Sequence, residues 1–204
     1  FRSGVARPAR SAATRVLKIS HQFPANIDFR DVLARKFAAE VEKRTNGALS
    51  FQIYPGSSLF KPGQQFDAMA SGALDMSVYV LAYSGGKLPA TNLTLMPALL
   101  ESYEQGYAWE KAPIGKWLEG YLADNGVALM TWVWQGGGSA SRDKAILVPA
   151  DIKGLKTRGA GKMIEIMLQA AGASISTFSS NETYNAMHSG VVDVLWTSSA
   201  SLMR

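Results

Sequence analysis

The residue with the clearest chemical potential is Arg158, which follows a short strand-like stretch at 155–157 and precedes a glycine-rich turn at 159–161. A guanidinium presents a planar fork of N–H donors that matches a carboxylate. A helix that begins near Gly159 or Ala160 would add free backbone N–H groups and the positive end of its dipole. The pattern fits a carboxylate-binding site and, equally well, a surface arginine that pairs with Glu165 or with nothing.

The sequence does not carry the residue sets of common cofactor or metal sites. Cysteine is absent, and the two histidines, His21 and His188, lie far apart, so neither thiolate chemistry nor a histidine-built metal site is expected. The glycines at 159–161 do not complete a phosphate loop or a dinucleotide fingerprint, because Lys156 and Ile164 stand where glycine is required. We therefore expect no resident cofactor and no metal ligands. The sequence leaves open whether a metal ion accompanies a bound ligand.

Three consecutive glycines at 136–138 follow a long apolar stretch. Such a run could form an oxyanion loop, but no serine–histidine–acid set accompanies it, and the nucleophile elbow Gly-x-Ser-x-Gly is absent. Glycine more commonly marks a turn, so we interpret the run as a tight crossover between two parts of the chain. The sequence thus predicts no catalytic residue and a protein that is not an enzyme.

The net charge of +5 comes largely from the N-terminal segment. Residues 1–15 contain four arginines and no acid, which leaves +1 for residues 16–204. A nucleic-acid surface needs a basic stripe on the folded part, so no nucleic-acid partner is expected. The longest uncharged run, 125–141, is too short for a bilayer span. Residues 1–14 lack an initiator methionine and an apolar core, so they are not an intact signal peptide. We treat 1–15 as an unstructured tail, either a residual signal or a tag.

Segments typical of strands alternate with segments typical of helices along the rest of the chain. The predicted strands cover residues 16–20, 49–54, 75–81, 127–134, 155–157, 174–178 and 192–196. The first helix would follow Asp28, which fits an N-cap. Its apolar residues recur every fourth position and predict a face turned toward the core; they are Phe29, Leu33, Phe37 and Val41. This alternation implies parallel pairing with right-handed crossovers, and hence an α/β fold.

Two windows in the two halves of the chain resemble each other. Residues 66–76 read FDAMASGALDM and residues 184–194 read YNAMHSGVVDV, and the same order of strands and helices surrounds both. We interpret the chain as the tail, a first lobe at 16–137 and a second lobe at 138–204. Ligands of open α/β sheets lie beyond the carboxyl ends of the strands, and a cleft between two lobes is the expected place for a small molecule.

Several stretches match the motifs of a known family. Residues 150–158, ADIKGLKTR, are similar to D-L-K-G-L-K-x-R, and residues 182–193 are similar to E-x-Y-x-A-L-x-x-G-x-x-D. The motifs F-A-E-E-V, T-x-G and Y-P-x-x-x-L resemble residues 37–41, 45–47 and 54–59. Over about residues 16–204, in consistent order, the chain resembles the DctP-type solute receptors of tripartite ATP-independent periplasmic (TRAP) transporters.

The resemblance implies a two-lobed, class II periplasmic-binding-protein-like α/β fold, with a mixed sheet flanked by helices in each lobe. It also implies a periplasmic receptor that binds a small organic acid, a carboxylate, between the lobes and delivers it to the TRAP membrane permease. Arg158 falls at the family's carboxylate-binding arginine. The family's mature chains are longer, so we expect the fold to be incomplete at the C-terminus.

Two departures from the family pattern concern the ligand. Gly138 stands where many members have a second arginine, and residues 196–198 read WTS where the family has E-N-P. The pocket should therefore differ from those of the sialic-acid and simple dicarboxylate receptors. The resemblance does not predict which organic acid binds.

Seven further residues are candidate ligand contacts, because they lie at expected strand ends or at a helix start. They are Gln22, His21, Tyr79, Trp134, Ser180, Trp196 and Thr197. Gln22 stands where the family often places a polar contact, with His21 beside it; either would equally serve to hold loop backbone. Tyr79 and Trp134 would equally fit the core.

Two other functions are compatible with a bilobal α/β chain. The effector-binding domain of a regulator has the same architecture, but residues 1–15 cannot be the DNA-binding helix-turn-helix that should precede it. A small α/β enzyme is disfavoured by the missing catalytic set. The fold alone does not decide among these functions.

Overall fold

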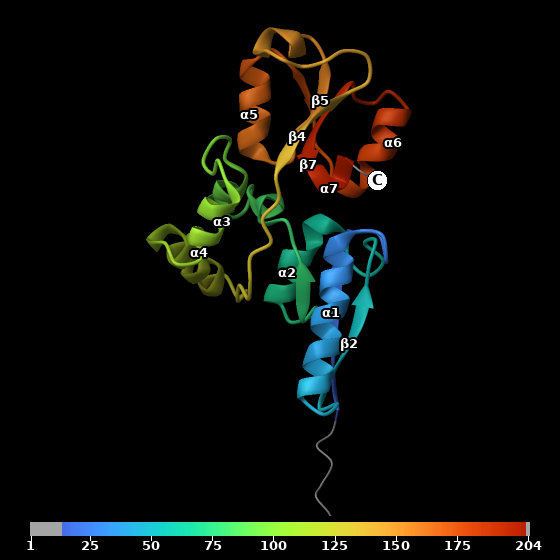
Figure 1. Ribbon diagram of the computed structural model, residues 1–204, viewed down its shortest axis with the longest axis vertical. Coiled ribbons are helices and arrows are strands. Elements are labelled where there is room, and N and C mark those ends of the chain that lie inside the picture. The colour runs from blue at the N-terminus through green and yellow to red at the C-terminus, as the bar shows by residue number, and fades with distance from the viewer. Residues whose placement is uncertain (1–13, 203–204) are drawn as a thin grey trace, which may run out of the picture.

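A computed structural model describes residues 14–202, which form two lobes, each built on its own sheet (Figure 1). Lobe 1 contains strands β1 (Arg15–His21), β2 (Leu49–Tyr54) and β3 (Met76–Val78), and helices α1 (Phe29–Arg44), α2 (Gln65–Ala70), α3 (Tyr103–Trp109) and α4 (Pro113–Asp124). Lobe 2 contains strands β4 (Gly137–Ser141), β5 (Lys156–Arg158), β6 (Ser174–Ser176) and β7 (Val194–Ser198), and helices α5 (Lys162–Ala170), α6 (Thr183–His188) and α7 (Ser199–Leu202). Short 3₁₀ helices include η2 (Leu81–Ser84), η3 (Pro89–Leu95) and η5 (Ser180–Glu182).

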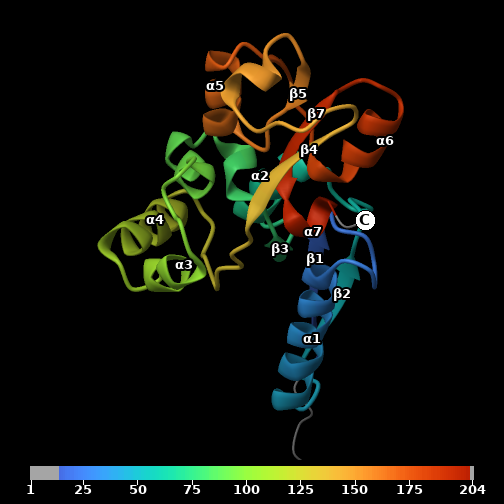
Figure 2. The same ribbon diagram turned by 45° about the horizontal axis from the view of Figure 1, so that its top comes forward.

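The two sheets share one strand order, as the sequence similarity between the halves predicts. In lobe 1 the order is β2-β1-β3 and all pairs are parallel. In lobe 2 the order β6-β5-β7 repeats this arrangement, and β4 adds an antiparallel edge beside β7. Helices α5 and α6 lie on either side of the second sheet (Figures 1 and 2). The α/β fold with helices flanking each sheet is confirmed, and the two similar windows fall on α2–β3 and α6–β7.

Strand β1 begins at Arg15, the last residue of the predicted tail. The rest of that prediction, residues 1–13, lies outside the described residues. Within residues 14–202, no helix has both the length and the apolar character needed to cross a membrane.

Helix α1 starts as predicted but turns a different face to its sheet. The carboxylate of Asp28 caps it by accepting from the N–H of Arg30. Its buried positions include Ala34 and Ala38, which pack on Ile19 of β1, because small side chains let the helix approach the sheet closely. The predicted apolar face is wrong in part: Phe29 and Leu33 are 41% and 44% exposed, whereas Phe37 keeps an edge-on ring contact with Phe51 of β2.

The predicted strand at 127–134 is also wrong, since within the described residues this segment pairs with no other strand. Its apolar side chains cover the helices instead: Trp132 and Trp134 stack on each other, and both rings meet Trp109 of α3 edge-on. An apolar run satisfies the strand pattern, but a strand forms only where a neighbouring edge is available. The strand that does form is β4, which starts within the glycine run interpreted as a crossover.

Helices α3 and α4 meet at a glycine. Helix α4 begins at Pro113. The buried residues Leu118 and Leu122 of this helix share a core with Trp109. At Gly115 an added Cβ would overlap the carbonyl oxygen of Trp109. This contact therefore requires the absence of a side chain.

Gly115→Ala should lower the free energy of unfolding by about 1–3 kcal/mol, because the added methyl group forces the two helices apart. Gly120→Ala is the matched control in the same helix. A Cβ there meets nothing within 4 Å, so this change should be neutral or stabilise by up to about 1 kcal/mol through helix propensity. Urea unfolding of both variants measures the difference, and equal effects would contradict the packing described.

Candidate functional site

The side chain of Arg158 is buried between the lobes and held only by uncharged oxygens. The residue is 1% exposed. Its Nε donates to the carbonyl oxygen of Phe178 at 2.9 Å and its Nη1 to that of Trp196 at 3.0 Å. Its Nη2 donates to the hydroxyl of Tyr83 at 3.3 Å. Among residues 14–202, no carboxylate forms an ion pair with it.

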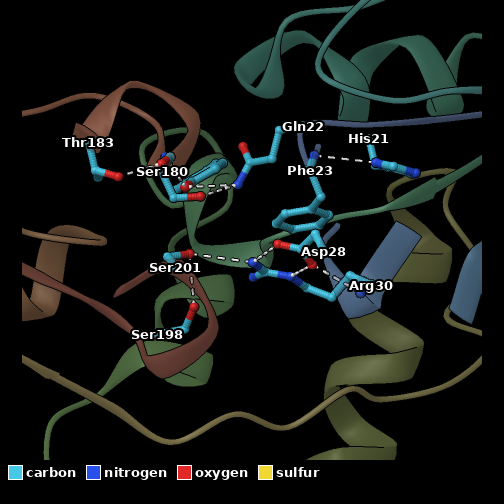
Figure 3. Close-up of polar contacts among 10 residues, drawn as sticks. His21, Gln22, Phe23, Asp28, Arg30, Ser180, Thr183, Ser198 and Ser201 are labelled. Carbon is cyan, nitrogen blue, oxygen red and sulfur yellow. Dashed lines mark hydrogen bonds and ion pairs between the residues drawn. The ribbon is translucent and has the colours of Figure 1, made fainter. Parts of the chain in front are cut away.

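A second buried arginine, Arg30, differs from Arg158 because its charge is balanced by a carboxylate. Arg30 donates from Nε and Nη2 to the two carboxylate oxygens of Asp28, at 2.8 and 2.7 Å. Its guanidinium carbon lies 3.7 Å from the centre of the Phe23 ring, and its Nη2 also reaches Ser201 Oγ of α7 at 3.4 Å (Figure 3). A buried charge is costly unless it is paired. Arg30 meets that condition, whereas Arg158 has no acidic partner among residues 14–202.

The alternative partner for Arg158 is engaged elsewhere. Glu165 is buried, and its Oε1 accepts from the hydroxyl of Thr177 at 3.0 Å. The helix after Arg158 also starts later than predicted, at Lys162. The backbone N–H that lies beside the guanidinium comes instead from Ser180, at the start of η5.

The hydroxyl of Tyr83 joins the two lobes at this point. It accepts from Ser180 N–H at 3.1 Å and from Gln22 Nε2 at 3.2 Å, in addition to Arg158. Gln22 Nε2 also donates to Ser180 Oγ at 2.9 Å, as Figure 3 shows. Tyr83 lies on η2 and Gln22 follows β1, both in lobe 1, while Ser180 and Arg158 belong to lobe 2. The site is therefore a cross-lobe cluster of hydrogen-bond donors around one cation.

Comparison with known proteins assigns the chain to a family. The model of the bacterial extracellular solute-binding protein family 7, DctP, matches residues 20–200. The chain belongs to the DctP family.

Relatives of this DctP-family chain are solute-binding proteins. A solute-binding protein of Albidiferax ferrireducens is 50% identical over 94% of the chain and 58% of its own length. A C4-dicarboxylate-binding periplasmic protein of Rhodobacter capsulatus is 31% identical over 78% of the chain and 49% of its own length. The crystal structure of a TRAP periplasmic solute-binding protein from Rhodoferax ferrireducens with bound malonate superposes with a TM-score of 0.89 at 50% identity, covering 91% of this chain and 60% of that one. The chain thus spans about half to three-fifths of the length of these relatives.

Five of the eight predicted contacts lie at or beside the cluster around Arg158. Gln22 and Ser180 contribute side chains, and Trp196 contributes its carbonyl oxygen. The Trp196 ring itself packs on the core of lobe 2. Thr197 is the next residue on β7; it is buried and pairs with Gly138.

The side chains of the other predicted contacts form no hydrogen bond with the cluster among the described residues. Tyr79 packs on the lobe 1 core, where burial raises the pKa of its hydroxyl, which bonds Ser84 Oγ at 2.7 Å. Trp134 packs on the same core, against Trp109 and Trp132. The strand predicted to carry Tyr79 to the cleft ends at Val78, and the Tyr79 ring meets that of Tyr83 edge-on while its hydroxyl bonds Ser84.

The side chain of His21 forms a separate buried group with α1. Its Nδ1 accepts from the N–H of Phe23 at 3.3 Å, and its Nε2 lies 3.2 Å from Asp31 Oδ1. Burial lowers the pKa of His21 and outweighs the attraction of Asp31. Burial alone would raise the pKa of Asp31, but hydrogen bonds from Arg35 and from Asn26 N–H lower it overall. The lowered pKa favours the neutral ring at pH 7, and the ring braces β1 against α1.

Sequence reasoning missed Tyr83 and Arg30. Tyr83 lies five residues after the end of β3. Its position just beyond the carboxyl end of a strand, where ligands of open α/β sheets bind, is the signal that could have identified it. Arg30 stands two residues after an N-cap aspartate, a spacing that allows its guanidinium to fold back onto that carboxylate. Within the described part of the chain, no group of three or more acidic or histidine side chains is placed to hold a metal ion.

His21 should give stability a pH dependence. Because its folded-state pKa lies below the ordinary value of 6.5, the unfolded chain binds the proton first, and the free energy of unfolding falls as the pH drops through that value. His21→Gln should flatten this slope in urea unfolding series between about pH 7 and pH 5. His188→Gln, at an exposed position on α6, should keep it. If His21→Gln leaves the slope unchanged, the pH dependence does not come from His21.

Substitution of each buried arginine by methionine should lower the free energy of unfolding by different amounts. Arg30→Met should lower the free energy of unfolding by about 3–5 kcal/mol, because it removes the bidentate partner of buried Asp28. Arg158→Met should cost less than about 2 kcal/mol, since the lost hydrogen bonds are offset by removing an uncompensated buried charge. Denaturant unfolding without added ligand measures both, and equal costs would mean that the protein itself compensates Arg158.

Proposed function

We propose that this chain is the ligand-binding part of a non-enzymatic receptor that holds a small organic acid at Arg158, between lobes at 16–137 and 138–204. The observation that carries the proposal is the buried guanidinium of Arg158, which has carbonyl and hydroxyl partners but no acidic partner among the described residues. A ligand carboxylate would supply the missing charge and form charge-assisted bonds, which are the strong kind.

The ligands of two relatives suggest which class of organic acid this chain binds. The solved structure at 50% identity holds malonate, and the relative at 31% identity is a C4-dicarboxylate-binding protein. Both ligands are short and carry two carboxylates. We propose a dicarboxylate of three or four carbons as the ligand class, with one carboxylate at Arg158. Gly138 and residues 196–198 depart from the family pattern, so the difference expected from the simple dicarboxylate receptors would lie in how the rest of the ligand is held.

Closure of the lobes would follow from the cross-lobe placement of the donors. Gln22 reaches the site from lobe 1, while Arg158 and Ser180 reach it from lobe 2. A carboxylate bound by both sides would favour the closed arrangement over an open one. As in the family, we propose that the closed receptor works in the periplasm and passes its ligand to the membrane permease of a TRAP transporter.

Removing the guanidinium should abolish tight binding. In the full-length chain, we expect Arg158→Ala to weaken malonate or succinate binding by roughly thirty-fold to several thousand-fold, the cost of leaving one partner of a buried charged pair alone. Arg158→Lys should also bind weakly, because it keeps the charge but loses the planar fork. Isothermal titration calorimetry measures each affinity.

The control is Arg142→Ala, which removes the same charge from the loop after β4 in the same lobe. Its affinity should match that of the unmodified chain. If Arg158→Ala binds within about twofold of the unmodified chain, far below the expected cost, the carboxylate is held elsewhere and the proposed site is wrong.

A further inference from the structure

We propose that Glu165 is a positioning residue for ligand binding: without touching the ligand, it holds the chain on both sides of the bond between Arg158 and Phe178, and so fixes the direction of the guanidinium. The inference rests on the proposed function, because it takes Arg158 as the group that binds the ligand. Glu165 acts through a hydrogen bond and a packing contact, not through its charge.

The direction of the Arg158 guanidinium depends on the carbonyl oxygen of Phe178. Arg158 Nε donates to this oxygen at 2.9 Å, and Nη1 donates to the carbonyl oxygen of Trp196 at 3.0 Å. Because the guanidinium is a rigid plane, two bonds at different nitrogens fix the direction of the N–H groups that remain. A shift of the Phe178 carbonyl would therefore turn the fork away from a bound carboxylate.

The backbone of Phe178 lies outside the sheet and needs another anchor. Strand β6 ends at Ser176, so strand pairing does not hold Phe178, whereas Trp196 lies within β7. The Phe178 ring packs against the core of lobe 2. The hydroxyl of Thr177, the residue before it, donates to Glu165 Oε1 at 3.0 Å. Glu165 thereby holds the backbone that presents the Phe178 carbonyl to Arg158.

Glu165 also packs on the residue that follows Arg158. A Cβ added at Gly159 would lie 2.5 Å from Glu165 Cγ and 3.2 Å from the Glu165 backbone nitrogen, so the turn after β5 rests directly on the first turn of α5. Glu165 thus contacts the chain next to both partners of the bond between Arg158 and Phe178. One side chain sets how these two residues lie relative to each other.

The burial of Glu165 is unusual for its place in α5, where residues 163–168 read MIEIML. Glu165 is 8% exposed, whereas its neighbour Ile166 is 47% exposed. Packing alone would favour the reverse, because a buried carboxylate is costly. Among residues 14–202, no cation forms an ion pair with Glu165, and the Thr177 hydroxyl and the positive end of the helix dipole offset the cost. A positioning role explains why a buried acid stands in this apolar stretch.

Three substitutions in the full-length chain test the role. Glu165→Gln keeps an acceptor oxygen for Thr177 and should bind malonate within about twofold of the unmodified chain. Glu165→Met removes the acceptor and Thr177→Val removes the donor. Each should bind malonate about threefold to tenfold more weakly, the range for one hydrogen bond. The double variant should bind no more weakly than Glu165→Met, because both changes remove the same bond. Isothermal titration calorimetry measures the affinities.

A second measurement follows Arg158 itself, without ligand. The Nε–H group of Arg158 gives a nuclear magnetic resonance signal that Arg158→Lys removes, and its exchange with water should be slow while it stays hydrogen-bonded. Glu165→Met and Thr177→Val should shift this signal and speed its exchange, whereas Glu165→Gln should not. Thr94→Val is the matched control, since the Thr94 hydroxyl bonds a carbonyl oxygen within lobe 1 at 2.8 Å; it should change neither the signal nor the affinity.

The outcomes separate the positioning role from the proposed function. If Glu165→Gln binds malonate as weakly as Glu165→Met, the charge of Glu165 matters and the inference is wrong. If Glu165→Met and Thr177→Val bind within about twofold of the unmodified chain, or leave the Nε–H signal unchanged, the inference is also wrong. If the unmodified chain does not bind malonate but these two variants alter the Nε–H signal, Glu165 positions Arg158 and the proposed ligand is wrong.

Discussion

The arrangement between the lobes depends on a positive charge that the described part of the protein buries without an acid to balance it. Arg158 is nearly inaccessible, and its three hydrogen bonds go to neutral oxygens. Such a group is stable in a protein only where other contributions outweigh the cost of removing the charge from water. The contrast with Arg30, which is equally hidden but paired to Asp28, shows that this chain can neutralise a buried arginine. At Arg158, we infer, it leaves that task to a ligand.

The repeated topology explains how this charge and its neighbours come together. Gln22 follows β1, the central strand of the first sheet, and Arg158 ends β5, which lies between β6 and β7 in the second. Both thus stand at the carboxyl end of an inner strand, where open α/β sheets bind ligands. Because the two lobes face each other with these ends, Tyr83 and Ser180 close the space between them through hydrogen bonds across the lobes.

Local signals in the sequence predicted most elements, because their causes are local. The N-cap at Asp28 formed as expected. The importance of Arg158 was also visible, since strand, turn and helix follow each other in sequence there. The duplicated strand order could be predicted from the similar windows in the two halves.

The larger errors concern contacts between distant residues. The periodicity of α1 could not show that its alanine face would meet the sheet, and the apolar run at 127–134 could not show that it lacked a neighbouring strand. The third strand ends three residues earlier than predicted, and the Tyr79 hydroxyl bonds Ser84 while the Tyr83 hydroxyl bonds Arg158. The residues next to position 158 in the sequence do not indicate that the Arg158 guanidinium has no carboxylate partner among the described residues.

A crystal structure of the full-length chain grown with malonate would test the central claim most directly. We predict one carboxylate of malonate within about 3 Å of the Arg158 guanidinium nitrogens, as in a charge-assisted pair. Malonate bound elsewhere, with Arg158 still held only by Phe178, Trp196 and Tyr83, would contradict the account.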